Sequence, residues 1–374
     1  MNALLLSGIV AAATGAPPQE WPSFRGGPEM RGVAAGELPS ELALRWVHHA
    51  EAAIVSSPVV SGGRVYFGSD DSHLYCIDLA TGERHWRMPT EDMIEAPPTV
   101  ADGAVYVGSN DFFLYAFDAQ SGEQRWRVEC DDKIAGAAVW LPAAGEMPAR
   151  VVVGAYDNKL HAFDAANGER LWAYETSNYV NGTPALVDGK LVFGGCDAGL
   201  HVVDAVTGEG LERVELGPEC HVAGSVGTAD GRVYLGHYGN RFDCFDMRSS
   251  ELVWSYPSER QPFFSSPAIG EDRLVFGGRD KLVHCVDRAS GERLWAFRTR
   301  RKVDSSPVIC GDAVVFGSGD GKVYMLGLED GEERWSYDIG ESVFTSPAVV
   351  DGLVLFGAND GGLYAFGAEP AEGR

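Results

Sequence analysis

Residues 56–86 read SSPVVSGGRVYFGSDDSHLYCIDLATGERHW, and this stretch decides the fold. It contains three runs rich in β-branched and aromatic residues, separated by glycine-containing turns, and a fourth run begins at Trp86. In four later copies the first turn is Asp-Gly, which accepts positive φ in tight hairpins, at residues 102–103, 188–189, 230–231 and 351–352. The pattern predicts a four-stranded antiparallel sheet in which consecutive strands pair.

The same pattern occurs eight times between residues 54 and 367. One glycine ends the second run of each copy: Gly68, Gly108, Gly154, Gly194, Gly236, Gly277, Gly317 and Gly357. Successive glycines are 40, 46, 40, 42, 41, 40 and 40 residues apart. Four strands in a period of about 40 residues are typical of β-propeller blades, since each small sheet buries both faces against its neighbours. We therefore predict an all-β, eight-bladed β-propeller of four-stranded antiparallel blades over residues 46–374.

Tryptophan follows the same period and indicates how the ring closes. It recurs at Trp46, Trp86, Trp126, Trp172, Trp254, Trp295 and Trp335, and the fourth copy has Glu212 at this position. A large side chain that recurs once per blade is expected to pack between sheets. The eighth copy ends before its tryptophan, whereas Trp46 precedes the first copy. We expect residues 42–48 to supply the fourth strand of the eighth blade, which removes an open sheet edge.

Composition and charge exclude several classes of function. The chain has 374 residues, 45% of them hydrophobic, and 30 basic residues against 54 acidic ones give a net charge of −24. Such a field repels nucleic acid, so no nucleic-acid partner is expected. The apolar stretch 3–16 is too short to span a bilayer and has the character of a signal-peptide core, although no Lys or Arg precedes it. We expect a signal peptide over residues 1–16, a leader over 17–45, a periplasmic or cell-envelope location, no transmembrane segment and a monomer.

Motifs for catalysis or metal binding are missing from the sequence. The seven cysteines form no CxxC pair, and Cys76, Cys244 and Cys285 occupy a buried strand position. His161, His201 and His284 share one strand position in separate copies, so no metal site is expected from them. Aspartate recurs at 71, 111, 157, 197, 280, 320 and 360, and this regularity indicates a hairpin-turn role.

The segments DLATGERHW (78–86), DAQSGEQRW (118–126), DAANGERLW (164–172) and DRASGERLW (287–295) resemble the tryptophan-docking motif of the pyrroloquinoline-quinone (PQQ) propeller repeat. The opening WPSFRGGPEMRGV (21–33) is similar to the leader of bacterial proteins in that superfamily. Its members include quinoprotein dehydrogenases, the outer-membrane assembly lipoprotein BamB and propellers without assigned activity. The motifs are specific for the fold and uninformative about function.

The resemblance implies two alternatives to a plain binding propeller. Quinoprotein dehydrogenases hold the quinone above the propeller axis with a cation, an acidic base, long insertions and often a disulfide of adjacent cysteines. This chain has no adjacent cysteines, and its one insertion is six residues long, near LPAAGEMPAR (141–150). A BamB-like assembly role is the second alternative, and the lack of a cysteine near residue 16 for lipid anchoring counts against it. We expect a non-catalytic binding or scaffold protein without a cofactor.

The candidate binding face is formed by the loops that lead into the first strands and the loops between the second and third strands. In units four to seven these loops depart from the repeat and carry bulky, hydrogen-bonding side chains: Tyr179, Asn181, His221, His237, Tyr238, Asn240, Arg241, Phe263, Phe264 and Arg279. Ordinary variation among loops explains the irregularity equally well. Acidic residues dominate this face in units one to three and basic residues in units five to seven, so the expected partner is a protein or an anionic small ligand.

Overall fold

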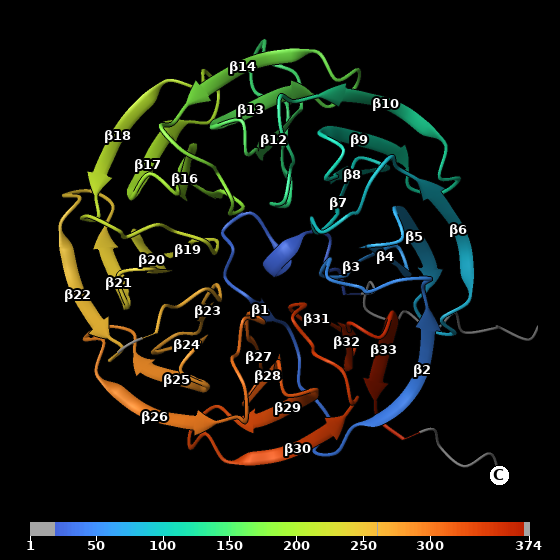
Figure 1. The fold of residues 1–374 in the computed structure, drawn as a ribbon, viewed down its shortest axis with the longest axis vertical. Coiled ribbons are helices and arrows are strands. Elements are labelled where there is room, and N and C mark those ends of the chain that lie inside the picture. Colours follow the sequence, from blue (N-terminus) through green and yellow to red (C-terminus); the bar gives the residue numbers. More distant parts are fainter. Residues whose placement is uncertain (1–18, 260, 370–374) are drawn as a thin grey trace, which may run out of the picture.

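The computed structural model describes residues 19–259 and 261–369, and it confirms the predicted propeller. Eight antiparallel sheets surround a central channel, and a short turn of helix lies at its centre (Figure 1). In every blade the strand nearest the channel is short and the fourth strand lies on the outer wall (Figure 1). Among these residues no helix has the length and apolar character needed to cross a membrane.

The first four blades follow one another without interruption. Blade 1 contains β3 (Val59–Ser61), β4 (Arg64–Ser69), β5 (His73–Asp78) and β6 (Arg84–Pro89). Blade 2 contains β7 (Thr99–Ala101), β8 (Ala104–Gly108), β9 (Phe113–Asp118) and β10 (Gln124–Glu129). Blade 3 contains β11 (Val139–Leu141), β12 (Arg150–Gly154), β13 (Lys159–Asp164) and β14 (Arg170–Glu175). Blade 4 contains β15 (Ala185–Val187), β16 (Lys190–Gly194), β17 (Gly199–Asp204) and β18 (Gly210–Glu215).

The other four blades complete the ring. Blade 5 contains β19 (Gly227–Ala229), β20 (Arg232–His237), β21 (Arg241–Asp246) and β22 (Leu252–Pro257). Blade 6 contains β23 (Ala268–Ile269), β24 (Arg273–Gly277), β25 (Leu282–Asp287) and β26 (Arg293–Arg298). Blade 7 contains β27 (Val308–Cys310), β28 (Ala313–Gly317), β29 (Lys322–Gly327) and β30 (Glu333–Asp338). Blade 8 contains β31 (Ala348–Val350), β32 (Leu353–Gly357), β33 (Gly362–Gly367) and the N-terminal strand β2 (Ala43–His49).

The predicted closure is confirmed by the pairing of β2 with β33. The two strands are antiparallel, with Trp46 opposite Ala365 and His48 opposite Leu363. Figure 1 shows the blue β2 on the outer wall beside the red β33. Because the last blade takes its outer strand from the start of the chain, the two ends of the propeller hold each other in one sheet.

The turns and tryptophans show why the repeat needs its glycines. Asp102 and Gly103 have φ values of 48° and 69°, the left-handed conformation expected of a tight Asp-Gly hairpin. Gly168, in the third turn of blade 3, lies against Trp126 of blade 2, and a Cβ there would be 2.9 Å from the indole. The Trp126 indole N–H also donates to the carbonyl of Ala165, at 3.1 Å. Each such indole therefore joins one blade to the next.

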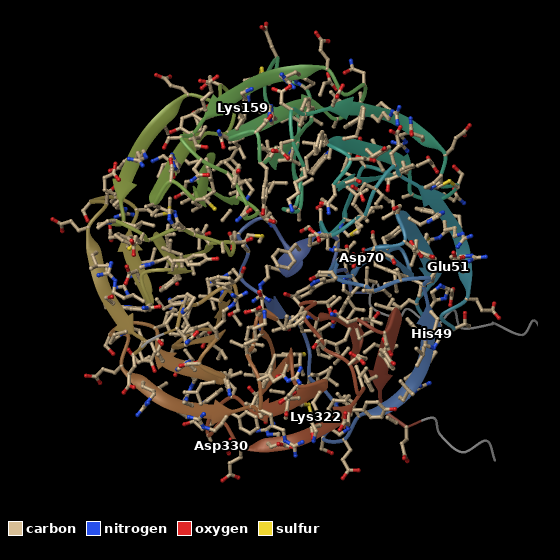
Figure 2. The ribbon with its side chains drawn as sticks, viewed as in Figure 1. His49, Glu51, Asp70, Lys159, Lys322 and Asp330 are labelled. Atoms are coloured by element: carbon tan, nitrogen blue, oxygen red, sulfur yellow. The ribbon has the colours of Figure 1, made fainter. Side chains whose placement is uncertain are left out.

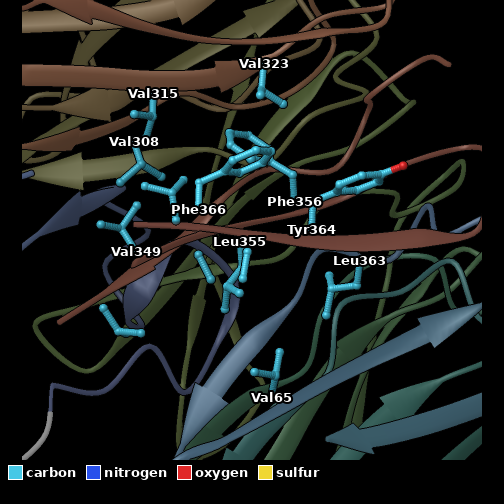
Figure 3. Packing of buried hydrophobic residues seen from close by; sticks show 14 of the residues in the cluster. Val65, Val308, Val315, Val323, Val349, Leu355, Phe356, Leu363, Tyr364 and Phe366 are labelled. Atoms are coloured by element: carbon cyan, nitrogen blue, oxygen red, sulfur yellow. The ribbon is translucent and has the colours of Figure 1, made fainter. Parts of the chain in front are cut away.

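The hydrophobic core lies between adjacent blades. Val65 and Phe67 of blade 1 belong to one buried cluster with Leu355 and Phe356 of blade 8. Figure 3 shows this cluster, in which side chains from blades 1, 7 and 8 interdigitate. Burial between sheets holds the ring together.

The leader around residues 19–34 plugs the channel, a role that the sequence did not reveal. The leader runs along the innermost strands, and backbone N–H groups on the channel-facing edge of these strands donate to its carbonyl oxygens. These bonds run from Val60 to Trp21 (2.8 Å), Val100 to Pro22 (2.7 Å), Leu186 to Pro28 (2.7 Å), Thr228 to Glu29 (3.0 Å), Ile269 to Arg31 (2.8 Å) and Ile309 to Gly32 (3.0 Å). Between Pro22 and Pro28 the chain forms the short helix η1 (Phe24–Gly26), which lies in the channel (Figure 1). After Gly32, β1 (Val33–Ala34) adds a parallel fifth strand to blade 7.

Arg25 anchors this plug. The residue is 2% exposed, and its guanidinium donates to three carbonyl oxygens, those of Ser306 (2.9 Å), Pro267 (2.7 Å) and Pro307 (2.6 Å). Burial lowers the pKa of Arg25 to about 9. We call the face with the turns between first and second strands the lower face. The plug enters from this face, because the backbone N–H of Gly62, in the turn of blade 1, donates to the Glu20 carboxylate (3.1 Å). The opposite face, with the loops that lead into the first strands, is the upper face.

Candidate functional site

A funnel of about 380 Å³ opens at the centre of the upper face, and Phe24 of the plug lines it from below. Each blade contributes one wall residue: Val55, Glu95, Ala135, Asn181, Ala223, Phe264, Asp304 and Phe344. The residue before each wall residue is Ile, Val or Phe, and it is fully buried. This packing residue holds the loop in place, while the wall position differs in chemistry from blade to blade. The wall is therefore the part of the repeat that is free to specify a ligand.

A ring of hydroxyl groups below the wall keeps the funnel in shape. The backbone N–H of Thr183 donates to Ser225 Oγ of the next blade (2.8 Å), and Ser346 donates in the same way to Ser57 Oγ (2.9 Å). Equivalent bonds join blades 3 to 8 and close back onto blade 1. Pro97 and Ala137 carry no hydroxyl at this position, so the ring is open at blades 2 and 3. Satisfied buried hydrogen bonds of this kind make a rigid support for a binding face.

An arc of aromatic and cationic side chains surrounds the funnel over blades 3 to 8, and we call it the aromatic rim. Its members are Lys133, Tyr156, Tyr179, His221, Tyr238, Phe264, Arg279, Lys302 and Phe344. Tyr156 and Tyr179 stack with centroids 4.7 Å apart, and Tyr238 lies 4.7 Å from Phe264. Tyr179 and Tyr238 are 43% and 45% exposed. Large aromatic surfaces that remain accessible on a rigid face are typical of recognition sites.

Cations lie over several of these rings. The Arg279 guanidinium carbon is 3.6 Å from the centroid of Phe264, and Lys302 Nζ is 4.8 Å from that of Phe344. Lys133 Nζ lies 4.6 Å from the Tyr156 ring. Such contacts hold the rings in fixed orientations before any partner binds.

The structure brings six of the ten predicted site residues to this surface. Tyr179, His221, Tyr238, Phe264 and Arg279 belong to the rim, and Asn181 lines the funnel. Asn240 lies in the neighbouring turn with φ 57°, and its carbonyl accepts from Ser258. Arg241 places its guanidinium 3.6 Å from Asp243 and 3.4 Å from the Leu216 carbonyl. These last two residues serve the turn and its ion pair.

Phe263 and His237 are corrections to the predicted set, because both are fully buried. Phe263 packs against Gly236, where other blades have Ile54 or Val222 against the same glycine. The sequence contained this signal, since Phe263 aligns with those residues. His237 forms a buried pair with Asp243, at 2.9 Å. Neither side chain reaches a partner on the upper face.

The pair of His237 and Asp243 corresponds to a hydrogen bond that recurs in the other blades, but the positions of the acid and of its partner are exchanged. In those blades the turn aspartate accepts from the strand Tyr or His, as Asp111 does from Tyr115 (2.7 Å). The same carboxylate also accepts a backbone N–H of its own turn, that of Phe113 for Asp111 (3.0 Å). The expected hairpin-turn role of these aspartates is therefore what the contacts show. In blade 5 the acid lies on the strand instead.

The charge asymmetry of the upper face is reduced by local ion pairs. Arg279 pairs with both carboxylate oxygens of Asp304, at 3.0 Å, and Lys302 approaches the same group at 2.6 Å. In the acidic sector Lys159 pairs with Asp131, at 3.1 Å. The funnel wall has the carboxylates of Glu95 and Asp304, and none of the described residues that line it is Lys or Arg. The site is therefore poorly suited to a free polyanion.

A pyrroloquinoline quinone does not fit these residues. The quinone carries three carboxylates. In the funnel these carboxylates would meet the acidic side chains of Glu95 and Asp304, and the described wall residues include no Lys or Arg to pair with them.

Sequence reasoning missed four members of the rim, Lys133, Tyr156, Lys302 and Phe344. They occupy the same loop positions as predicted members: Tyr156 aligns with Tyr238, and Phe344 aligns with Phe264. Lys133, Tyr156 and Phe344 belong to the loops of units three and eight, outside the predicted set, whereas Lys302 lies in the entry loop of unit seven and its sequence indicated only a basic charge.

The fold and its repeats define a propeller of the PQQ-like repeat class. A family model described as outer membrane protein assembly factor BamB matches residues 33–139, 70–219 and 196–371, and the chain belongs to this family. No curated protein sequence matches the chain.

Solved structures show the same architecture. BamB from Moraxella catarrhalis is 20% identical with a TM-score of 0.75, over 89% of this chain and 99% of that chain. Quinohemoprotein alcohol dehydrogenase from Comamonas testosteroni is 13% identical with a TM-score of 0.81, over 95% of this chain and 82% of that chain. The computationally designed protein Ika8 is 18% identical with a TM-score of 0.75, over 89% and 100% of the two chains. At these identities the likeness establishes the fold.

Proposed function

We propose that this protein is a non-catalytic binding propeller that holds a protein partner on the aromatic rim of its upper face. The observation that carries the proposal is the chain of contacting side chains from Tyr238 through Phe264 to Arg279, on loops fixed by the hydroxyl ring. Exposed tyrosines supply contact area at a small entropy cost, and an arginine fixes orientation. A polypeptide provides the extended apolar and polar surface that such an arc can cover.

An anionic small ligand was the other partner that the sequence suggested, and the local charges favour it less. Arg279 and Lys302 both already pair with Asp304, which offsets part of their charge. Glu95 adds a second carboxylate at the wall. A small anion would have to displace these pairs, whereas a protein can cover the rim without breaking them.

Site-specific photo-crosslinking in the native host tests the proposal. A benzophenone amino acid at position 238 should yield one discrete adduct, because the side chain is exposed in the middle of the rim. Position 112 is the matched control: Phe112 is 42% exposed in the corresponding loop of blade 2, outside the rim. The same adducts from both positions, or none from position 238, would contradict a rim-specific partner.

Two family-derived alternatives are tested separately. If the protein were a quinoprotein dehydrogenase, PQQ with calcium would raise the melting temperature and support alcohol-dependent dye reduction. We expect neither, because the chain lacks the long insertions that cover the quinone in that family, and the described residues that line the funnel include no Lys or Arg for its carboxylates. If it acts in outer-membrane assembly, as the family description suggests, the adduct from position 238 will contain a component of the barrel-assembly complex.

We propose a periplasmic or cell-envelope location for this protein. The proposal rests on family membership and on the apolar stretch 3–16, which lies outside the described residues. If the stretch is a cleaved signal, the intact mass of the natively expressed protein should correspond to a start near Pro17. A mass that retains residues 1–16 would contradict export by this route.

A further inference from the structure

Three potential metal ligands meet between blades 2 and 3. Cys130 follows β10 of blade 2, Asp157 lies in the turn between β12 and β13, and His161 is in β13. The thiol sulfur, a carboxylate oxygen and an imidazole nitrogen all lie within 4.8 Å of one another. Cys130 and His161 are fully buried, and the Asp157 side chain is 3% exposed. Sequence analysis placed His161 alone in its blade, and the thiol that joins it comes from the neighbouring blade.

Cys130 replaces a residue that has another task elsewhere in the repeat. Thr90, Thr176 and Thr299 occupy the same position, and each donates its hydroxyl proton to a backbone carbonyl of its own blade. The backbone N–H of Cys130 keeps the equivalent bond, to the Phe112 carbonyl at 2.8 Å. The thiol has no such bond among the described residues and lies next to the pair of Asp157 and His161 instead.

The imidazole of His161 provides a second, independent observation. Its Nε2–H donates to Asp157, at 2.8 Å, which leaves Nδ1 as an acceptor. Nδ1 is buried and has no hydrogen-bond partner among the described residues. The corresponding nitrogens of His201 and His284 contact the hydroxyls of Tyr174 (3.1 Å) and Tyr256 (3.0 Å). Blade 2 has Val128 at the position of these tyrosines, so the polar partner is missing where the thiol is present.

We propose that Cys130, Asp157 and His161 form a binding site for one thiophilic divalent metal ion of the zinc type. A thiolate, an imidazole and a carboxylate are the ligand types that zinc takes in proteins, and water completes a tetrahedral set. Burial raises the pKa of the Cys130 thiol to about 12, so the metal-free thiol is protonated. Binding forms bonds from the metal to the Cys130 sulfur, to Nδ1 of His161 and to a carboxylate oxygen of Asp157. The hydrogen bond between Asp157 and His161 breaks so that the carboxylate can coordinate, and the thiol proton is released to solvent.

The surroundings favour a cation. Asp131 and Asp132 lie in the loop that follows Cys130, and the Asp131 N–H donates to the Asp157 carboxylate. Lys159, labelled on blade 3 in Figure 2, is held by Asp131 at 3.1 Å. Arg170 is a second cation near the site, because its guanidinium donates to the carbonyl of Glu129, the residue before Cys130 (3.3 Å), but Asp131, Asp132 and Asp157 outnumber these two cations. The local acidic field therefore raises the concentration of cations at the approach to the site.

Cobalt titration of the reduced full-length protein tests the proposal, since Co²⁺ reports thiolate ligation by a charge-transfer band. We expect one equivalent to bind with this band, and zinc to displace it. Cys130→Thr and His161→Tyr install residues that the repeat uses at these positions in other blades, so both should fold. Each removes a direct ligand and should lose the band. Because loss of an outer-shell partner already costs roughly 10- to 100-fold, binding should weaken by about 100-fold or more. Zinc should raise the melting temperature of the wild type and leave that of both variants unchanged.

Two variants distinguish this site from adventitious binding. Cys196→Ser removes the least buried cysteine, and His284→Tyr removes the equivalent histidine of blade 6, where the preceding blade has Ser258 at the position of Cys130. Both should bind cobalt as the wild type does. A charge-transfer band that survives in Cys130→Thr, or the lack of a band in the wild type, would overturn the assignment. The outcome does not depend on the proposed function of the aromatic rim.

Discussion

The indole N–H of Trp46 donates to the backbone carbonyl of Leu79, at 3.0 Å, and this bond joins the last blade to the first. Trp46 lies on β2, the strand that the start of the chain contributes to blade 8. In the turn of blade 1, Gly82 comes so close to the indole that a Cβ would be 2.8 Å away. The contact that joins consecutive blades elsewhere is thus used here between the two ends of the propeller.

Truncation tests the strength of this closure. Deleting residues 1–20 should leave stability nearly unchanged, whereas deleting residues 1–50 removes the plug and β2 and exposes the edge of β33. We expect the melting temperature of the longer truncation to fall by more than about 5 °C relative to the shorter one. Deleting residues 1–41 should give an intermediate value, because it removes the plug and keeps the closing strand. Equal melting temperatures for the truncations at 20 and 50 would refute closure by β2.

Blade 4 provides a test of how tryptophan and glycine depend on each other. It has Glu212 in place of the tryptophan. A tryptophan there would contact a turn of blade 5, in which Ser250, with φ 57°, occupies the position that is glycine in other turns. Glu212→Trp alone should destabilise the protein, because the indole would meet the Ser250 side chain. Glu212→Trp combined with Ser250→Gly should remove this conflict. Urea unfolding of the four proteins should show a coupling free energy of about 1 kcal/mol, and additivity would refute the dependence.

Arg25→Met tests the plug. The guanidinium donates to three buried carbonyl oxygens, and methionine fills similar volume but leaves all three without a donor. We expect the free energy of unfolding to fall by about 3 kcal/mol. Arg45→Met is the control, since Arg45 is exposed and bonds only the Ala368 carbonyl among the described residues. The prediction fails if both substitutions have the same small effect.

Asp197 should make stability depend on acid pH. Burial acts to raise its pKa, but the hydrogen bond and charge of His201, the Ser177 N–H and the charge of Arg213 overcome burial and hold the pKa at about 2. The folded value lies below the ordinary value of 3.8, so the carboxylate stabilises the fold above pH 3.8, and this contribution is lost as pH falls through 2. Asp197→Asn should flatten the decline of the melting temperature between pH 4 and 2. Asp188→Asn, in an exposed turn, controls for net charge; a decline in Asp197→Asn as steep as that of the wild type would count against the prediction.

Much of the candidate site could be located from the sequence, because departures from a repeat stand out against it. Tyr238, Phe264 and Arg279 were found in this way, and the structure brings them into contact. Phe263 was misassigned, because a large aromatic residue in an irregular loop was expected to be exposed. Its position is buried against the glycine of the second strand in every blade. Tyr156 and Lys133 were missed because their own loops have the same length and turn aspartate as the regular loops of other units.

The sequence by itself determined the blade, the number of blades and the closing strand. Those features depend on contacts within one blade or between neighbours in the ring, and each such contact recurs with the period of the repeat, as Trp126 against Gly168 does. The tertiary structure alone decided the plug and the cluster of Cys130, Asp157 and His161. Arg25 bonds carbonyls up to 282 residues away, and Cys130 meets His161 only because adjacent sheets pack face to face. Contacts of this kind leave no period in the sequence, because each is made once and depends on how the ring brings distant segments together.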